Sequence, residues 1–408
     1  MSTRFDVEKV RADFPILGLE VHGKPLTYLD NGASAQKPTA VLDRMMHAYT
    51  AEYANVHRGL HYLSNLATDA YEAARESVRR FLNAGSVDEI VFTRSSTEAL
   101  NLLAASYGGL VLKPGDEVVI SILEHHSNIV PWHFHRERNG VKIVWAPVKA
   151  DTSFDLEAFE ALLTPRTKIV SITHMSNVTG TVVPIREVCE IAHARGIKVF
   201  VDGSQGAVHL PVDVQALGCD AYVITGHKLY GPTGIGALWA KRELLEEMPP
   251  FMGGGEMIET VTEDGVIYGG VPQKFEAGTP PIVQAIGLGA AVDYLTGLGR
   301  EAILAHEEDL RDYAHERLGA LNYVTIYGTA PGKGAILSFE LAGAHAHDVA
   351  TVLDREGVAV RAGTHCALPL LTRLGVSATC RASFGLYNTR AEVDRLAAAI
   401  EKAHRFFA

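Results

Sequence analysis

The stretch YVITGHKLYGPTGIGALW, residues 222–239, decides the fold. With Ala221, its first residues form a short apolar run that has the length and β-rich composition of a buried strand. The run opens into a loop of glycine, proline and threonine around Lys228, and a second β-rich run follows. An ammonium group at the end of a buried strand needs an explanation, because burying a charge is costly.

Five more β-rich runs precede this stretch and alternate with segments whose apolar residues recur at helical spacing. Such alternation predicts an α/β fold with a mostly parallel sheet that is covered by helices on both faces. Ligands of such sheets bind at the carboxyl ends of the strands. The five runs are EIVFTR (89–94), DEVVISI (116–122), KIVWAPV (142–148), TKIVSITH (167–174) and KVFVDG (198–203).

Two domains are expected in a chain of 408 residues. The alternating region and a helical pattern from Pro281 to about Leu298 place the large α/β domain at residues 20–290. Residues 291–408 predict a smaller α+β domain. We expect residues 1–19 to pack on this smaller domain, since they contain no core of their own.

Composition argues against two classes of partner. The net charge is −11 and no cluster of lysine or arginine resembles a nucleic-acid footprint, so nucleic acid is not expected. No apolar run approaches the length of a membrane span, which predicts a cytoplasmic protein without a membrane partner. The spacing of the four cysteines fits neither a zinc pattern nor a disulfide framework, so free thiols in a reducing compartment are predicted.

The surroundings of Lys228 predict chemistry. Burial lowers the pKa of an ammonium group and makes its amine available for reaction with an aldehyde. Another core strand ends in the carboxylate of Asp202. A lysine and a strand-end carboxylate are what a pyridoxal phosphate site requires. The segment from Ser95 to Glu98 has the form of a capping box, whose helix start provides donors for a phosphate.

At this point the sequence resembles the group II, SufS-type cysteine desulfurases of the class V aminotransferase family. The resemblance covers nearly the whole chain and implies the type I fold of pyridoxal-phosphate-dependent transferases. It rests on these segments in order: YLDNGASAQKP (28–38), NVHRGLH (55–61), EHHSNIVPW (124–132), ITHMSNVTG (172–180), VDGSQGAVHLPVDV (201–214), TGHKLYGPTGIG (225–236), KFEAGTPP (274–281), VRAGTHCALP (360–369) and CRAS (380–383).

The resemblance implies a set of residues that bind the cofactor. Lys228 matches the lysine that holds its aldehyde, Asp202 the partner of the pyridine nitrogen, and His125 the imidazole stacked on the ring. Thr279 matches a phosphate contact lent by a second subunit, which implies a homodimer. The implied cofactor-binding residues are Lys228, Asp202, Gln205, His125, Ser96, Thr97, Thr225, His227 and Thr279.

For the reaction, the resemblance implies conversion of L-cysteine to L-alanine, with Cys366 receiving the sulfur as a persulfide for iron-sulfur cluster assembly. Lys228, Cys366 and His125 are the implied catalytic residues, and His125 is expected to shuttle the thiol proton. The implied substrate-binding residues are Arg381, Asn177, His57 and Arg361. The chain departs from the family where Thr364 replaces a usual histidine.

A sulfur-acceptor protein is also implied. Relatives that work with a zinc-containing SufU-type acceptor tend to carry a histidine at the place of His347, whereas relatives that use SufE-type acceptors need not. The histidine would replace a zinc ligand of the acceptor transiently, and imidazole suits zinc. We therefore favour a SufU-type acceptor and expect no resident metal.

Other functions remain as alternatives. A selenocysteine lyase or another class V aminotransferase-like enzyme would share the lysine and the fold, and Cys366 is what separates a desulfurase from a transaminase. A metal-dependent hydrolase built on the histidines of residues 125–135 lacks an HExxH pattern. A nucleotide-binding oxidoreductase would need a third glycine after GLGAAV at residue 287. A catalytically inactive scaffold is opposed by the intact lysine, aspartate and thiol.

Overall fold

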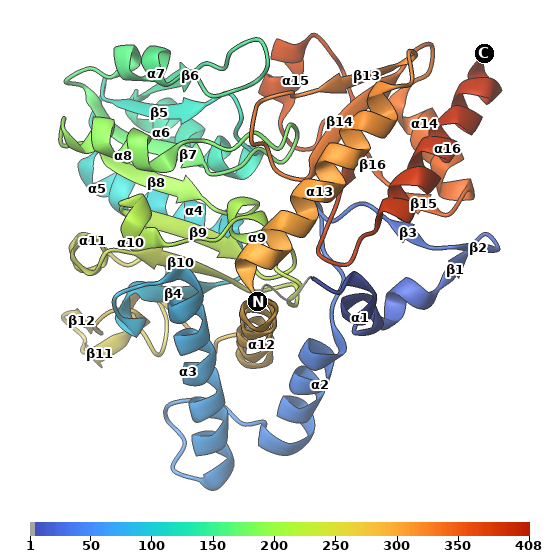
Figure 1. The fold of residues 1–408 in the computed structure, drawn as a ribbon. Helices are drawn as coiled ribbons and strands as arrows, with labels where there is room; N and C mark the ends of the chain where they lie inside the picture. The colour runs from blue at the N-terminus through green and yellow to red at the C-terminus, as the bar shows by residue number, and fades with distance from the viewer. Residues whose placement is uncertain (1–4) are drawn as a thin grey trace.

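The computed structural model describes residues 5–408, which form a large domain around a seven-stranded sheet and a small domain around a four-stranded sheet (Figure 1). The order in the large sheet is β4-β10-β9-β8-β7-β5-β6. Its strands are β4 (Ile90–Thr93), β5 (Glu117–Ser121), β6 (Lys142–Ala146), β7 (Thr167–Thr173), β8 (Lys198–Asp202), β9 (Ala221–Thr225) and β10 (Gly236–Ala240). The predicted strands are thus confirmed.

The sheet is mainly parallel, as expected, because β5 to β9 all run in one direction, whereas β10 runs against both of its neighbours. Strand β9 shows why these runs are mostly apolar. Tyr222 and Ile224 pack into one hydrophobic cluster, and Ala221 and Val223 pack into another on the opposite face. Since side chains of a strand alternate between the two faces, a strand covered on both sides is apolar at consecutive positions.

Helices cover both faces (Figure 1). Helices α3 (Tyr62–Leu82), α7 (Leu156–Leu162), α8 (Ile185–His193), α9 (Gly206–His209), α10 (Val214–Leu217) and α12 (Ile282–Leu298) contribute to the first cluster. Helices α4 (Ser96–Leu103), α6 (Val130–Asn139) and α11 (Arg242–Glu247) contribute to the second. Other helices of this domain are α2 (Thr39–His47) and α5 (Gly109–Val111).

The small domain has a core of its own. Its antiparallel sheet has the order β13-β14-β17-β16, with β13 (Val324–Tyr327), β14 (Ile336–Leu341), β16 (Arg361–Gly363) and β17 (Thr379–Ser383). Helices α13 (Arg300–Gly319), α14 (Ala346–Arg355) and α16 (Arg390–Phe407) pack on it, and α15 (Leu368–Leu374) follows β16. The loop between β16 and α15 carries Cys366.

The joint between the domains lies later than predicted. Residue 290 falls inside α12, which packs on α3 and α2 of the large domain. The chain changes direction by 78° between α12 and α13, at Gly299, whose φ of +88° suits glycine. The apolar pattern of the sequence continues past residue 290 without interruption. The prediction relied on this pattern and therefore placed the domain boundary inside a helix.

The start of the described chain is divided between the two domains. Arg11 of α1 (Val7–Ala12) donates to the backbone of Tyr387 and pairs with Glu392 of α16, as expected for packing on the small domain. The short strand β3 (Thr27–Tyr28) also pairs with β15 (Val358–Ala359) of that domain. Between α1 and β3 in the chain, the strands β1 (Glu20–Val21) and β2 (Lys24–Pro25) pair as a short antiparallel ribbon. Residues 20–28, which were predicted for the large domain, therefore lie with the small one.

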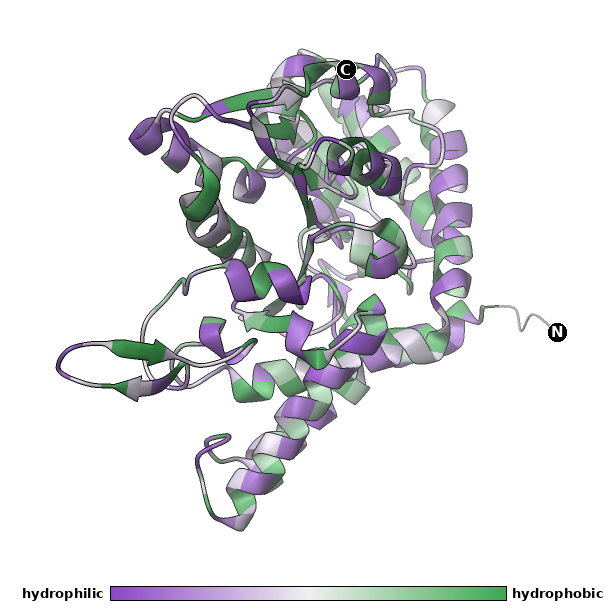
Figure 2. Cartoon of the chain, turned by 90° about the vertical axis from the view of Figure 1, so that its left-hand side faces the viewer, coloured by the Kyte–Doolittle hydropathy of each residue, from purple (hydrophilic) through white to green (hydrophobic). Residues whose placement is uncertain are grey.

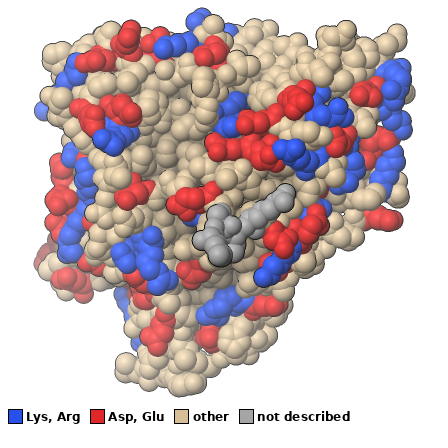
Figure 3. All heavy atoms as spheres, in the orientation of Figure 1, with Lys and Arg blue, Asp and Glu red and all other residues tan. Residues whose placement is uncertain are grey.

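The surface shows acidic and basic side chains interspersed over the face in Figure 3. One hairpin, β11 (Ile258–Val261) with β12 (Val266–Tyr268), reaches out from the large domain and carries apolar residues (Figure 2). In residues 5–408, no single helix has the length and apolar composition of a membrane span, and only the bent pair α12 and α13 meets those two criteria together.

Candidate active site

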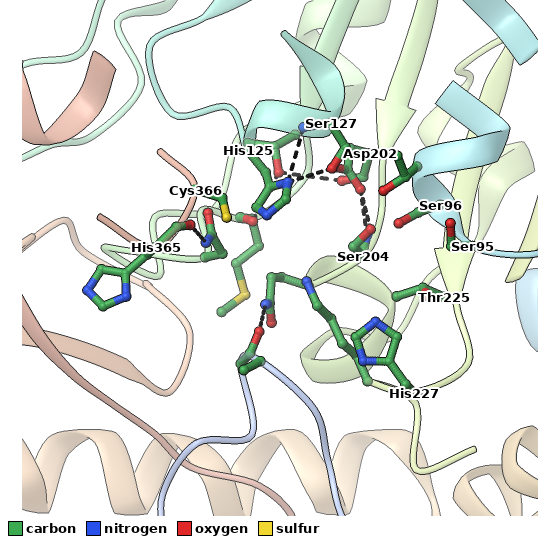
Figure 4. Close-up of a pocket in the computed structure, with 18 of the residues that line it drawn as sticks. Ser95, Ser96, His125, Ser127, Asp202, Ser204, Thr225, His227, His365 and Cys366 are labelled. Atoms are coloured by element: carbon green, nitrogen blue, oxygen red, sulfur yellow. Dashed lines mark hydrogen bonds between the residues drawn. The ribbon is translucent and has the colours of Figure 1, made fainter. Parts of the chain in front are cut away.

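A cavity of about 270 Å³ lies at the carboxyl ends of β7, β8 and β9 and also reaches the small domain (Figure 4). This is the edge at which ligands of parallel sheets bind. Most of the predicted site residues line it together. They are Ser96, Thr97, His125, Asn177, Asp202, Gln205, Thr225, His227, Lys228, Arg361, Cys366 and Arg381.

Lys228 follows β9 in a tight turn, in which the N–H groups of Leu229 and Gly231 donate to the carbonyl of Gly226. Burial lowers the pKa of the lysine amine to about 8, while the nearby carboxylate of Asp202 favours the ammonium form. Roughly a tenth of the amine is therefore neutral at pH 7, far more than for an ordinary lysine with a pKa of about 10.4. This confirms the sequence-based expectation of a desolvated amine at the end of this strand.

Asp202 ends β8 and is 3% exposed. Its Oδ1 accepts hydrogen bonds from the N–H and the hydroxyl of Ser204, at 2.9 and 2.5 Å. These two donors fix one oxygen and hold the carboxylate at the cavity wall. A buried anion is the group that keeps a pyridine nitrogen protonated.

The other end of the cavity suits an anion. Ser95 caps helix α4 by accepting from the N–H of Glu98 at 3.3 Å, and Ser96 and Thr97 begin the helix. The Glu98 carboxylate accepts from the N–H of Arg94, one residue before the cap, so the predicted capping box is only partly formed. Thr225 contributes a buried hydroxyl that has no hydrogen-bond partner among the described residues.

These donors fit a phosphate, because helix N-termini and unpaired hydroxyls stabilise anions. The close packing that forms this corner depends on Gly236. A Cβ at this position would come within 2.6 Å of the Ile224 carbonyl oxygen and 2.8 Å of the Ser95 carbonyl carbon. The lysine, the carboxylate and the phosphate corner together fit pyridoxal phosphate.

His125 lies between the lysine and the cysteine loop. Burial, reinforced by the charge of Lys228, lowers the pKa of its imidazole to about 4. The ring is therefore neutral at neutral pH and can accept a proton. Its Nδ1 lies in hydrogen-bond contact with the Ser127 hydroxyl, which orients the ring within the cavity (Figure 4).

Two arginines of the small domain share one carboxylate. Asp30 contacts Arg361 through three N–O distances of 2.7 to 3.3 Å and Arg381 at 3.4 Å. Arg381 is 2% exposed, and its Nε is buried without a partner among the described residues. Its Nη1 donates to the carbonyl of Asn177 at 2.9 Å. The pair of guanidinium groups suits a substrate carboxylate.

Cys366 is exposed and lines the cavity, whereas the other three cysteines are buried and unpaired. Its sulfur interacts electrostatically with the cations of Lys228, Arg361 and Arg381. His365, the sequence neighbour, is not among these cations, because burial lowers its pKa to about 3 and leaves it neutral.

Two predicted residues lie outside the cavity of the single chain. His57 is exposed in the loop before α3 and pairs with Glu72 at 2.9 Å, an interaction that raises its pKa. Thr279 is exposed and borders a separate hollow next to α4. The roles of both residues remain predictions.

Sequence reasoning missed several residues that organise the site. Ser204 lies two positions after Asp202, where a serine commonly bonds an aspartate, and this spacing could have revealed it. Gly32 faces Arg381 so closely that a Cβ would lie 3.2 Å from the guanidinium carbon. Asp30 is 331 positions from Arg361, so no local pattern could indicate their contact.

Known proteins share both the sequence and the architecture of this chain. The model of the aminotransferase class-V family matches residues 27–396. A cysteine desulfurase of Pectobacterium atrosepticum is 49% identical over 402 residues, which cover 98% of each chain. The structure of the cysteine desulfurase CsdA of Escherichia coli has a TM-score of 0.92 at 40% identity and covers 100% of both chains. That of an apo cysteine desulfurase from Thermococcus onnurineus has a TM-score of 0.94 at 36% identity, with 99% of each chain covered.

The reactivity of Lys228 tests the electrostatics of the cavity. In ligand-free protein, labelling of this amine by reductive methylation is expected to rise with a midpoint near pH 8, because burial lowers its pKa to about that value. An ordinary lysine has a pKa of about 10.4. Asp202→Asn removes a charge that favours the ammonium form, so it should move the midpoint lower. Peptide mass spectrometry measures both profiles, and a wild-type midpoint near 10 would contradict burial of the amine.

Proposed function

The chain belongs to the aminotransferase class-V family and is a pyridoxal-phosphate-dependent cysteine desulfurase, and we propose that it is of the group II type and transfers sulfur from L-cysteine to Cys366. The observation that carries this proposal is that Lys228 and Cys366 line one cavity although they belong to different domains. A transaminase needs the lysine but has no use for a thiol in that position.

One chain offers most of the contacts that the cofactor needs. Lys228 would hold its aldehyde, Asp202 its ring nitrogen, and the start of α4 with Thr225 its phosphate. Gln205 donates its amide to the Gly32 carbonyl at 2.8 Å and remains in the cavity wall, where the family places a contact to the ring hydroxyl. When bound, pyridoxal phosphate withdraws electrons from the Cα of an amino acid and so weakens neighbouring bonds.

The substrate carboxylate is assigned to Arg381. Its guanidinium group is buried and has an unpaired Nε, and the weak 3.4 Å contact with Asp30 leaves it available. A charge-assisted contact of this kind contributes roughly 1.5 to 3 kcal/mol. Asn177 is the predicted second ligand, and it would bind through its Nδ2, which here donates to the carbonyl of His365 at 2.7 Å. Arg361 is bound more tightly to Asp30 and lies next to the thiol.

Proton handling is divided between an amine and an imidazole. With a pKa of about 8, Lys228 can both accept and return a proton near neutral pH. His125, whose pKa of about 4 keeps it neutral, can accept the proton of a thiol. We therefore assign proton transfer at the substrate carbon to Lys228 and proton transfer at the sulfur to His125.

The sulfur transfer balances without a further reactant. The Cys366 thiolate attacks the sulfur of L-cysteine, a sulfur–sulfur bond forms, and the carbon–sulfur bond breaks. The electron pair stays with the substrate carbon, which gains a proton and becomes the methyl group of alanine. The carbon is reduced and the two sulfur atoms are oxidised to a persulfide. Arg361 and Arg381 line the same cavity as the attacking sulfur.

A homodimer is proposed because the site of one chain lacks Thr279. Exposed apolar side chains support an interface, since large exposed apolar groups commonly mark one. They occur near α2 and the start of α3 and on the β11–β12 hairpin. The most exposed of them are Met46, Tyr53, Leu60, Tyr62, Val261 and Ile267.

We also propose that the persulfide passes to a zinc-containing SufU-type acceptor for iron-sulfur cluster assembly. His347 lies exposed in the first turn of α14, a helix that contacts β16 next to the cysteine loop. Its ring stacks with that of His345 at 5.3 Å between centroids. An exposed imidazole on this helix supports the proposal, because imidazole is a suitable ligand for the acceptor's zinc. The cytoplasmic location remains a prediction.

Removing the thiol separates cofactor binding from sulfur transfer. Cys366→Ser should keep the cofactor absorbance and lose alanine formation from L-cysteine by roughly a hundredfold or more, because a hydroxyl is a far weaker nucleophile than a thiolate. The control is Cys189→Ala, which removes a buried thiol of α8. Alanine and sulfide assays measure the outcome. Full activity of Cys366→Ser would exclude the proposed sulfur transfer.

The dimer is tested by mass and by complementation. Light scattering should give twice the chain mass of 44.1 kDa. Hybrids of Lys228→Ala and Thr279→Ala chains should regain one competent site per dimer, because one site then combines an intact lysine with an intact threonine from the partner. Activity no higher than that of either homodimer would show that Thr279 does not act across an interface.

The acceptor assignment is tested by comparing two neighbouring histidines. His347→Ala should lose most of the stimulation of desulfurase turnover by a zinc-loaded scaffold acceptor, whereas His345→Ala should keep it. The basal rate without acceptor serves as the reference. Equal stimulation of His347→Ala and the wild type would remove the zinc-ligand role.

A further inference from the structure

The loop that carries Cys366 has a strained backbone. His365 and Cys366 have φ values of +53° and +54°, in the left-handed region that side chains other than that of glycine rarely adopt. Two such residues in succession cost free energy and persist only where contacts around them enforce the conformation. The direction of the sulfur therefore depends on what holds this loop.

On the side of the small domain, the loop is held through His365 and Ala367. The Nε2 of His365 lies 2.9 Å from the hydroxyl and 3.1 Å from the carbonyl oxygen of Thr379 on β17. The N–H of Ala367 donates to the carbonyl of Thr364 within the loop at 3.0 Å. These contacts belong to the small domain, so none of them fixes the loop relative to Lys228.

On the side of the large domain, two residues reach across the joint. The side chain of Asn177 donates to the carbonyl of His365 at 2.7 Å. The N–H of His126 donates to the carbonyl of Cys366 at 2.7 Å, and the Nε2 of the same histidine accepts from the N–H of Leu368 at 3.1 Å. His126 thus bonds the chain on both sides of residue 367, next to the nucleophile.

The bond to Leu368 also caps a helix. Leu368 begins α15, and its N-cap residue, Ala367, has no side chain that can accept a hydrogen bond. The first N–H groups of a helix lack partners within the helix and need an external acceptor. The His126 imidazole supplies one from the other domain. Burial lowers the pKa of this imidazole, so it is neutral and can accept at neutral pH.

The position of His126 in the chain adds to its effect. It directly follows His125 and begins the short 3-10 helix His126–Asn128. The imidazole that lines the cavity and the residue that hydrogen-bonds the Cys366 loop are therefore adjacent in the chain. A displacement of one residue shifts the other. The distance between the His125 imidazole and the Cys366 sulfur is thereby tied to a single backbone segment.

We propose that His126 is a positioning residue, whose hydrogen bonds hold the Cys366 loop against the large domain and so orient the sulfur toward the substrate. This role rests on the proposed function, in which Cys366 is the nucleophile. His126 touches neither substrate nor cofactor in this scheme. It acts through the loop, and a shift of about 1 Å at a reacting atom can reduce a rate roughly a hundredfold.

The test compares two substitutions of the holoenzyme. His126→Gln places an amide oxygen near the position of Nε2 and keeps an acceptor, whereas His126→Leu has similar bulk and no acceptor. Neither change removes a core residue, because His126 is only partly buried, and an uncapped Leu368 N–H can be hydrated. The control is His133→Leu on α6, which changes another partly buried histidine of the same region.

For His126→Leu, we expect the single-turnover rate of alanine formation to fall by roughly a hundredfold, with KM for L-cysteine changed much less, because Arg381 is untouched. Amide hydrogen exchange in residues 364–372 should become faster. His126→Gln should restore most of the rate and the protection, and His133→Leu should resemble the wild type in both. The cofactor absorbance should be the same in all variants.

Three outcomes would overturn the role. They are an unchanged rate in His126→Leu, equal losses in His126→Leu and His126→Gln, or a rate loss without faster exchange in residues 364–372. Failure of the proposed function would give a different result, because Cys366→Ser would then keep its activity whatever the exchange data show.

Discussion

The chemistry of the site depends on the desolvation of one amine, that of Lys228. Lys228 is held in the cavity by the turn after β9, and burial, rather than a neighbouring cation, is the main cause of its low pKa. The Asp202 carboxylate opposes this effect and prevents the amine from losing its proton altogether. The two groups come from the ends of β9 and β8, which are paired in parallel. The sheet therefore sets both the reactivity of the amine and the position of its counter-charge.

The site also requires that a separate domain delivers the thiol and the arginines. Asp30 controls the arginines, since it binds Arg361 closely and Arg381 loosely. One carboxylate thus keeps one guanidinium group beside the thiol and leaves the other available to the substrate. A buried contact of 2.7 Å between the Nδ1 of His209 on α9 and the carboxyl group of Glu307 on α13 ties the two domains together. A cavity built across a joint needs such ties, because the reacting groups otherwise move independently.

Much of this could be predicted from the sequence, for physical reasons that differ from residue to residue. The strands of the large sheet are covered on both faces, so their central positions are mostly apolar and the strands stand out from the helices. Lys228 and Asp202 stand out in turn because they are charged groups at the ends of such strands. Cys366 has Arg361 and His365 as sequence neighbours, but its role as the sulfur acceptor could be assigned only through the resemblance of its loop. His57 and Thr279 were proposed in the same way, and the single chain leaves them outside the cavity.

The residues that escaped prediction are those whose role exists only in three dimensions. Asp30 and Arg361 meet because β3 pairs with β15, a contact between the two ends of the chain. His126 escaped for another reason. In the segment EHHSN, His125 accounts for the motif, and His126 has the character of an ordinary surface residue until the loop of the other domain is placed against it. The strained loop that carries the nucleophile is held by a residue of the other domain, and a contact of this kind cannot be recognised from local sequence patterns.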